Sequence, residues 1–188
     1  MGGSLLHMLH FSRMRLLLLS GNNVSNEAWI DLVANVLKTD FDVHVHRYRH
    51  WRTGDRYIDL EHELEAIEAL TADWDTYGVF AKSAGTLLTM KGAFEGRLYP
   101  KKCVFVGVPI PWGIENDRYD HAWLDAFGVP TRFIQQEFDR FLHAADLRNL
   151  LDAHNHAGAE LITVPGSSHE YEDVKGVAGH AKRFLQKG

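Results

Sequence analysis

Short apolar runs alternate with longer amphipathic segments along almost the whole chain. Each run has the length of a strand and is apolar at nearly every position, which is typical of strands buried on both faces of a parallel sheet. The runs are Met14–Ser20, Val43–Tyr48, Tyr77–Lys82, Cys103–Val108, Arg132–Gln136 and Leu161–Val164. The pattern therefore predicts six strands, each ending at a polar or glycine-containing segment.

Apolar residues at helical spacing fill the intervals between these runs. Leu60, Leu64 and Ile67 share one face of a helix, and the glutamates at 61, 63, 65 and 68 are expected mostly to face water. Further stripes of this kind are Trp29, Val33, Val36 and Leu37; Ala144, Leu147, Leu150 and Leu151; and Val177, Ala181, Phe184 and Leu185. Strands that alternate with helices predict an α/β protein with a doubly wound, mostly parallel six-stranded sheet flanked by helices.

The alternation is continuous, so it predicts one domain at residues 14–188 preceded by an N-terminal extension at residues 1–13. A chain of 188 residues with 45% hydrophobic content is long enough for one well-buried domain. The longest irregular region, Ile110–Val129, lies between the fourth and fifth runs. We see no repeat and no linker in the sequence.

Charge and composition narrow the classes of function. A net charge of −5 offers no basic surface for nucleic acid. Leu16–Leu19 is too short to span a membrane, and no adequate signal-peptide core or cleavage site follows Arg13 and Arg15, so we expect a cytoplasmic protein. The single cysteine, Cys103, excludes an internal disulfide and lies in an apolar run, which predicts a buried thiol.

A serine stands where the third run meets the helix that follows it, in YGVFAKSAGTLLTM. In parallel sheets the functional residues lie just past the carboxyl ends of strands, so Ser83 is a candidate nucleophile. A tight strand-to-helix turn needs small residues two positions before and after the nucleophile, and Ala81 and Gly85 meet that need. The alternative is a serine that only caps the helix.

An acid and a histidine follow two later runs. Asp139 comes after the fifth run, in Glu137-Phe138-Asp139-Arg140, and His169 comes after the sixth, in Gly166-Ser167-Ser168-His169. A serine hydroxyl becomes a useful nucleophile when an imidazole accepts its proton, and a carboxylate holds that imidazole in the correct tautomer. We therefore expect Ser83 as nucleophile, His169 as base and Asp139 as the orienting acid, in the chain order of α/β-hydrolases.

The oxyanion that forms during such a reaction needs two backbone donors. The Ala84 N–H, at the start of the helix after Ser83, is one candidate, helped by the helix dipole. The Asn22 N–H, in the loop after the first run, is the other. We expect the substrate pocket to include Asn23, Trp112 and Phe141.

Four segments together resemble small α/β-hydrolases: LLLLSGNN, VFAKSAG, FIQQEFD and VPGSSHEYED. The resemblance runs from about Met14 to the C-terminus and is to compact members that lack the first two strands of the full fold and have almost no cap. It implies a serine hydrolase with Ser83, Asp139 and His169 as its triad. The shortness of the Ile110–Val129 region argues against a large lid, so we expect a carboxylic ester hydrolase that acts on small or flexible acyl groups through an acyl-enzyme and needs no cofactor. The chain departs from the family pattern at three places: Ala81 replaces a glycine, Ser20 replaces a histidine, and Gln136 replaces a glycine that often precedes the acid.

Several residues have competing interpretations. Asp139 can be a turn or cap aspartate before a helix beginning near Phe141, and His169 can be a surface histidine. Three other aspartates, Asp117, Asp120 and Asp125, compete for the acid role. The aromatic residues of the irregular region can pack on the sheet edge, form one wall of the substrate pocket, or do both; they are Trp112, Tyr119, Trp123 and Phe127.

Other chemistries fit the sequence less well. The run before Ser83 superficially matches a phosphate-binding loop, but the required glycines are missing and an apolar strand runs where a loop is needed. His44 with His46 and His154 with His156 have zinc-like spacing without further ligands, so we interpret them as solvated histidines and expect no metal. A thioesterase, an amidase, and a binding protein with an inert serine all stay open, as does the oligomeric state.

Overall fold

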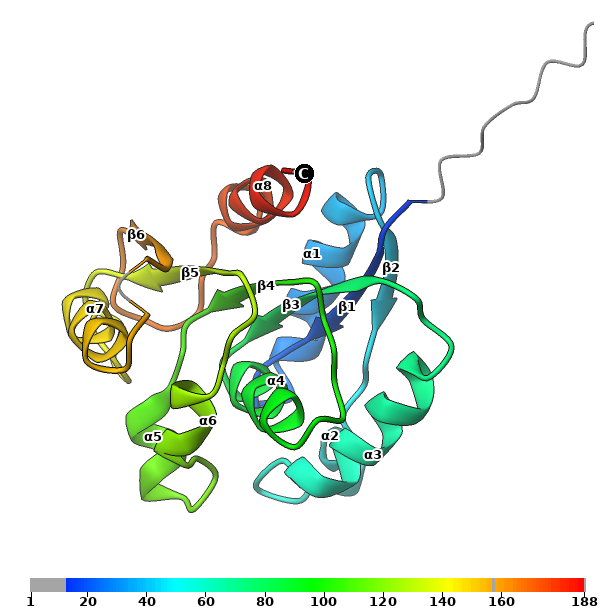
Figure 1. Ribbon diagram of the computed structural model, residues 1–188, viewed down its shortest axis with the longest axis horizontal. Helices are drawn as coiled ribbons and strands as arrows, with labels where there is room; N and C mark the ends of the chain where they lie inside the picture. Colours follow the sequence, from blue (N-terminus) through cyan, green and yellow to red (C-terminus); the bar gives the residue numbers. More distant parts are fainter. Residues whose placement is uncertain (1–12, 157, 188) are drawn as a thin grey trace, which may run out of the picture.

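The computed structural model describes residues 13–156 and 158–187 and is built on one parallel sheet (Figure 1). The strands are β1 (Arg15–Leu19), β2 (Asp42–Val45), β3 (Tyr77–Lys82), β4 (Lys102–Val106), β5 (Thr131–Gln136) and β6 (Glu160–Val164). Their order across the sheet is β2-β1-β3-β4-β5-β6, and every neighbouring pair is parallel. The predicted fold class is confirmed. Residues 1–12 of the predicted extension lie outside the described residues, and the single domain stays a prediction.

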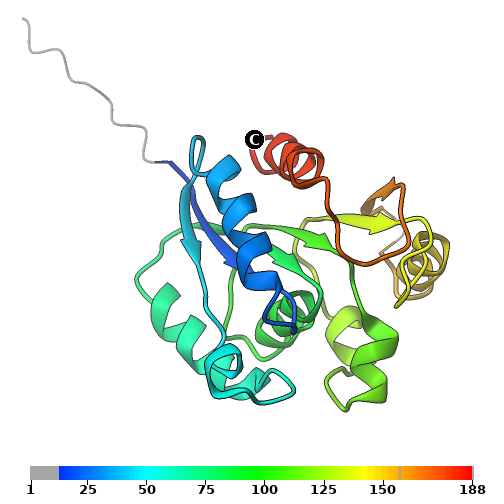
Figure 2. The same cartoon turned by 180° about the vertical axis from the view of Figure 1, so that it is seen from behind.

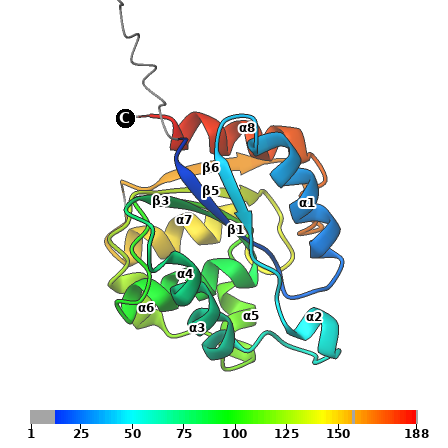
Figure 3. The same ribbon diagram turned by 90° about the vertical axis from the view of Figure 1, so that its right-hand side faces the viewer.

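Helices cover both faces of the sheet. On one face, α1 (Asn26–Leu37) and α8 (Val174–Leu185) lie side by side, as Figure 2 shows. The other face carries α3 (Leu60–Thr71), α4 (Ala84–Phe94), α5 (Ile110–Glu115), α6 (His121–Asp125) and α7 (Ala144–Ala153), and Figure 3 shows the two layers with the sheet between them. A single helical turn, α2 (His50–Thr53), follows β2.

The core is divided by the sheet because successive strand residues point to opposite faces. Leu17 and Leu19 pack with α3 and α4, whereas Leu16 and Leu18 pack with α1 and α8. All four are fully buried, and each buried leucine contributes about 1.5–3 kcal/mol of hydrophobic free energy. The continuous apolar run in β1 is thus explained by burial on both sides.

Glu63 departs from the prediction for its helix. We expected the glutamates of α3 mostly to face water, but the Glu63 side chain is only 3% exposed. Its carboxylate accepts hydrogen bonds from His46 Nε2 at 2.7 Å and from the Arg49 backbone N–H at 2.7 Å. The segment after β2 brings these donors over α3, so a charge that the helix alone would expose is buried and paired.

The order of the strands decides which loops meet. The chain leaves β1 through α1 to pair β2 on one side, and it leaves β3 through α4 to pair β4 on the other side. The two connections diverge between β1 and β3, which makes this pair the topological switch point of the sheet. In such sheets, ligands bind at the carboxyl edge where the connections diverge. The loop after β1 and Ser83 after β3 both lie there.

Gly85 lets α4 begin close against β1. Its N–H donates to the Ser20 carbonyl at 3.0 Å. A Cβ at this position would lie 2.8 Å from both the Leu19 Cβ and the Ser20 carbonyl oxygen, which is closer than such atoms normally approach. The small residue predicted two positions after Ser83 is therefore required by the backbone of the neighbouring strand.

We expect Gly85→Ala to lower the free energy of unfolding by about 1–3 kcal/mol, because the added methyl group must displace a buried backbone. Gly179→Ala is the matched control, since it also lies in a helix and its nearest contact is the Arg183 side chain at 3.5 Å. That control is expected to gain up to about 1 kcal/mol from helix propensity. Urea denaturation measures both variants. A Gly85→Ala variant as stable as the unmodified protein contradicts the prediction.

Candidate active site

Ser83 occupies a strained turn between β3 and α4. Its backbone has φ 52° and ψ −123°, a conformation that a residue with a Cβ rarely adopts. The turn is held by the Ser83 N–H, which donates to the Val106 carbonyl at 2.9 Å, and by the Thr86 hydroxyl, which donates to the Ser83 carbonyl at 2.7 Å. The Ser83 side chain makes no capping hydrogen bond to the helix. The capping interpretation is therefore wrong, and the hydroxyl stands free for another partner.

That partner is His169, which in turn contacts Asp139. The Ser83 Oγ lies 2.9 Å from His169 Nε2, and His169 Nδ1 lies 2.7 Å from Asp139 Oδ2. An ionised carboxylate can only accept, so Nδ1 carries the hydrogen and Nε2 offers its lone pair to the serine hydroxyl. This tautomer is the one that can remove a proton from Ser83. The structure thus brings together the serine, the histidine and the aspartate that the sequence singled out.

The surroundings of Asp139 keep it ionised. Its carboxylate is fully buried. Burial by itself raises the pKa of Asp139, but hydrogen bonds from His169, from the Phe141 N–H at 3.0 Å and from the Tyr171 hydroxyl at 2.7 Å outweigh it and leave that pKa below its ordinary value. Burial and the Asp139 charge raise the pKa of Tyr171, so the phenol stays a donor.

Two positioning residues escaped the sequence analysis. The Tyr171 hydroxyl accepts from the Gln136 N–H at 3.0 Å while it donates to Asp139. The Gln136 side-chain oxygen accepts from the His169 N–H at 2.8 Å. Both His169 and Tyr171 have positive φ, 68° and 55°, and these hydrogen bonds hold their loop in that strained form. Gln136 was visible in the sequence only as a departure from glycine, and nothing marked Tyr171.

The loop after β1 is clamped at Asn22. The Asn22 side-chain oxygen accepts from the Ile58 N–H at 2.7 Å. Its backbone carbonyl accepts from His50 Nε2 at 2.6 Å and from Trp51 Nε1 at 3.1 Å. The backbone N–H groups of Asn22 and Ala84 donate to no group in residues 13–156 or 158–187. Two backbone donors in the described residues therefore remain unengaged, one in the loop after β1 and one directly after Ser83.

A cavity of about 190 Å³ opens at Ser83. The three predicted pocket residues, Asn23, Trp112 and Phe141, line it together with several polar and charged side chains. The Phe141 ring meets the His169 ring edge-on, with the ring centroids 4.6 Å apart. The remaining aromatic residues of the irregular region, Tyr119, Trp123 and Phe127, pack against the core on the α4 face. Of the four, only Trp112 lines this cavity.

None of the rival aspartates contacts His169 in the part of the chain that the structure describes. Asp120 caps α6 by accepting from the Ala122 N–H, and Asp125 pairs with His154. Asp117 lies in a turn with φ 55°. The helix expected to begin near Phe141 instead begins at Ala144, because residues 137–143 form the turn that presents Asp139.

The histidines with zinc-like spacing are held by protein groups. His46 pairs with Glu63, His154 pairs with Asp125, and His156 Nε2 lies 2.7 Å from the Leu124 carbonyl oxygen. The interpretation of these three as solvated is wrong, because each is largely buried against a partner from another segment. The described ranges contain no group of three or more side chains that could hold a metal ion.

No helix within residues 13–156 and 158–187 is long and apolar enough to cross a membrane. The Cys103 thiol is fully buried, as predicted, and its burial raises its pKa.

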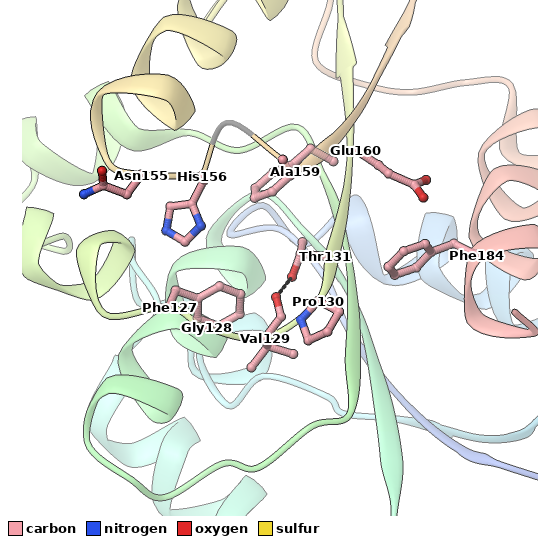
Figure 4. Close-up of a pocket in the computed structure, with 12 residues that line it drawn as sticks. Phe127, Gly128, Val129, Pro130, Thr131, Asn155, His156, Ala159, Glu160 and Phe184 are labelled. Carbon is pink, nitrogen blue, oxygen red and sulfur yellow. Dashed lines mark hydrogen bonds between the residues drawn. The ribbon is translucent and has the colours of Figure 1, made fainter. Parts of the chain in front are cut away.

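A larger cavity, of about 510 Å³, lies at the opposite edge of the sheet (Figure 4). Thr131 and Glu160, which line it, begin β5 and β6 at their amino ends. Its titratable side chains are already engaged: Glu160 pairs with Arg132, and His156 contacts the Leu124 carbonyl. The larger cavity therefore offers no pair of a nucleophile and a base like the one that Ser83 and His169 form at the carboxyl edge.

No protein-family model matches the sequence, and no curated protein matches it significantly. Solved structures do match. A protein assigned to the α/β-hydrolase superfamily from Xanthomonas campestris pv. campestris superposes with a TM-score of 0.71 at 15% identity, over 93% of this chain and 99% of that one. An esterase domain from a Rhodothermus marinus protein gives 0.71 at 12% identity, over 94% and 88%. The thioesterase domain from the curacin biosynthetic pathway gives 0.65 at 11% identity, over 93% and 92%.

At such low sequence identities, structural similarity establishes only that the folds are alike. The parallel sheet, the order of its strands and the strained serine turn at the end of β3 agree with that likeness. The chain therefore has the α/β-hydrolase fold.

Proposed function

We propose that the protein is a serine hydrolase, and that its substrates are small or flexible carboxylic esters. One observation carries the proposal: the Ser83 Oγ lies 2.9 Å from His169 Nε2 while the buried Asp139 carboxylate holds the other ring nitrogen. A nucleophile bonded to a base that is itself oriented by an acid is the arrangement that acyl transfer requires.

The reaction follows from these contacts in two halves. His169 Nε2 takes the hydroxyl proton as the Ser83 Oγ attacks the ester carbonyl carbon, and the carbonyl oxygen becomes an oxyanion. The N–H groups of Asn22 and Ala84 would donate to it. The intermediate collapses, the alkoxide leaves with the proton from His169, and an acyl-serine remains. Water then attacks the acyl-serine with His169 as base, which releases the carboxylic acid and restores Ser83.

The shape of the site favours small substrates. The cavity at Ser83 holds about 190 Å³, and the segments beside it, α5 and α6, are only 6 and 5 residues long. Helices of that length cover little of the carboxyl edge. Trp112 and Phe141 offer apolar walls, and Asn23 offers a polar group. Among proteins of similar fold are an esterase domain and a thioesterase domain, so thioesters belong in the same substrate screen. The cytoplasmic location stays a prediction.

Ser83→Ala is expected to abolish covalent labelling by a fluorophosphonate probe and to lower ester turnover by about 10³-fold or more, because no other group takes the acyl chain. Gel fluorescence measures the labelling. Ser167→Ala, at an exposed serine near His169, is the control and should label like the unmodified protein. Equal labelling of Ser83→Ala, or no labelling of the unmodified protein, overturns the nucleophile assignment.

Asp139→Asn is expected to lower kcat for p-nitrophenyl acetate by about 10³–10⁴-fold, since an amide no longer holds the His169 tautomer that accepts the serine proton. Circular dichroism should report an intact fold. Asp125→Asn is the matched control, because that aspartate pairs with His154 and makes no contact with His169. Near-normal turnover by Asp139→Asn, with loss in the control, would move the acid role to the 110–129 segment.

Tyr171→Phe removes a hydroxyl that donates to Asp139 and accepts from Gln136. We expect kcat to fall by about tenfold with KM unchanged, and the free energy of unfolding to fall by about 1–3 kcal/mol. Tyr119→Phe is the control, since the Tyr119 hydroxyl is buried with no hydrogen-bond partner among residues 13–156 and 158–187, so its loss should cost nothing. Steady-state kinetics and urea denaturation give the two values, and equal effects of both substitutions would refute the role of Tyr171.

A further inference from the structure

Lys82 is a buried cation next to the nucleophile. It is the last residue of β3, directly before Ser83, and its side chain is 1% exposed. The Nζ donates to Asn26 Oδ1 at 2.6 Å and lies 4.8 Å from the centroid of the Trp29 ring. Within the described ranges, no carboxylate lies within ion-pair distance of it. An ammonium is thus kept in the interior with an amide and an aromatic ring as its partners.

Asn26, the partner of Lys82, makes hydrogen bonds to the loop after β1. Its side-chain Nδ2 donates to the Asn23 carbonyl at 2.9 Å, and its backbone carbonyl accepts from the Ser20 hydroxyl at 3.1 Å. Gly21 packs directly on the Asn26 amide, since a Cβ there would lie 2.8 Å from the Nδ2 atom. Asn26 therefore contacts the loop that carries the Asn22 N–H at Ser20, Gly21 and Asn23.

Lys82 connects Ser83 to the loop after β1. A covalent bond joins it to Ser83, and the hydrogen bonds through Asn26 join it to Asn23 in the loop. The opposite side of the loop is held at Asn22 by His50 and other donors. The loop is therefore held on both sides, and the Lys82–Asn26 hydrogen bond is a side-chain connection between it and the strand that bears Ser83.

The ammonium is costly to keep there, which indicates a role. Burial lowers the pKa of Lys82 to about 8, although the charges of Glu170 and Asp139 act to raise it and Arg140 acts to lower it. An apolar side chain would fill the same space without that cost. A hydrogen bond from a charged donor is stronger than one from a neutral amine, so the charge itself strengthens the hold on Asn26.

We propose that Lys82 is a positioning residue whose ammonium, through the Asn26 amide, holds residues 20–26 so that the Asn22 N–H meets the oxyanion formed at Ser83. The role in catalysis rests on the proposed hydrolase function, whereas the hold on the loop does not. Removing the ammonium should loosen the loop and weaken the interaction made only in the transition state.

Hydrogen exchange tests the hold on the loop independently of any reaction. In Lys82→Met, a substitution of similar length, the amides of residues 20–26 should exchange about tenfold faster or more, because the loop opens more often. Lys91→Met is the control, since that lysine pairs with Glu61 and Glu95 on the far side of α4. Unchanged exchange at residues 20–26 in a folded Lys82→Met overturns the proposal.

A second variant keeps the test independent of whether Lys82→Met folds. Lys82→Gln retains a polar side chain but removes the ammonium that donates to Asn26. The amides of residues 20–26 should again exchange faster than in the unmodified protein, while those of β3 keep their protection. Unchanged exchange at residues 20–26 in a folded Lys82→Gln overturns the proposal.

Kinetics then test the catalytic part of the proposal. With p-nitrophenyl acetate, Lys82→Met should lower kcat by about 10–100-fold with little change in KM. Asn26→Ala should lower it as much, and the double variant should lose no more than either. Additive losses, or a normal kcat in Lys82→Met, overturn the catalytic role. If the unmodified protein does not react with a fluorophosphonate, the proposed hydrolase function is overturned instead. The hydrogen-exchange result does not depend on that outcome.

Discussion

The buried Asp139 carboxylate is the group around which the carboxyl edge of the sheet is organised. A charge without solvent costs several kcal/mol unless donors surround it, and here the donors come from two separate segments of the chain. Phe141 follows Asp139 in the turn after β5, whereas His169 and Tyr171 belong to the loop after β6. The positive φ angles of that loop are tolerated because they deliver these donors. The hydrogen bonds that stabilise the Asp139 carboxylate thus also position the His169 ring.

The other half of the site depends on how closely β1, β3 and α4 approach one another. Gly85 lets the helix begin against Ser20, and this contact sets the turn that lifts Ser83 above the sheet. The loop after β1 comes alongside because the connections diverge at this point of the sheet. The proposed nucleophile therefore follows β3 and the proposed oxyanion loop follows β1, whereas the proposed acid and base follow β5 and β6. The rigid register of the sheet holds the two halves together.

Much of this arrangement could be predicted, because parallel sheets place functional residues at strand ends. Ser83, Asp139 and His169 each follow an apolar run, and that local signal survives in the structure. Residues whose role depends on a distant partner were missed. Glu63 has the pattern of a surface residue on its own helix, and only His46 from another segment makes its burial acceptable. The aromatic residues at 119, 123 and 127 pack on the core because α5 and α6 fold back against α4.

The sequence by itself determined the alternation of strands and helices, the two-sided core and the residues that end each strand. Periodicity and side-chain size suffice for these, since they act over a few neighbouring residues. Only the tertiary structure decided which groups hold the proposed catalytic ones. Tyr171 and Gln136 contact Asp139 and His169, and Lys82 with Asn26 contacts the proposed oxyanion loop. Their hydrogen bonds join segments up to 56 residues apart along the chain, as between Lys82 and Asn26. Hydrogen bonds act over about 3 Å, so only the packing of the sheet and helices could select them.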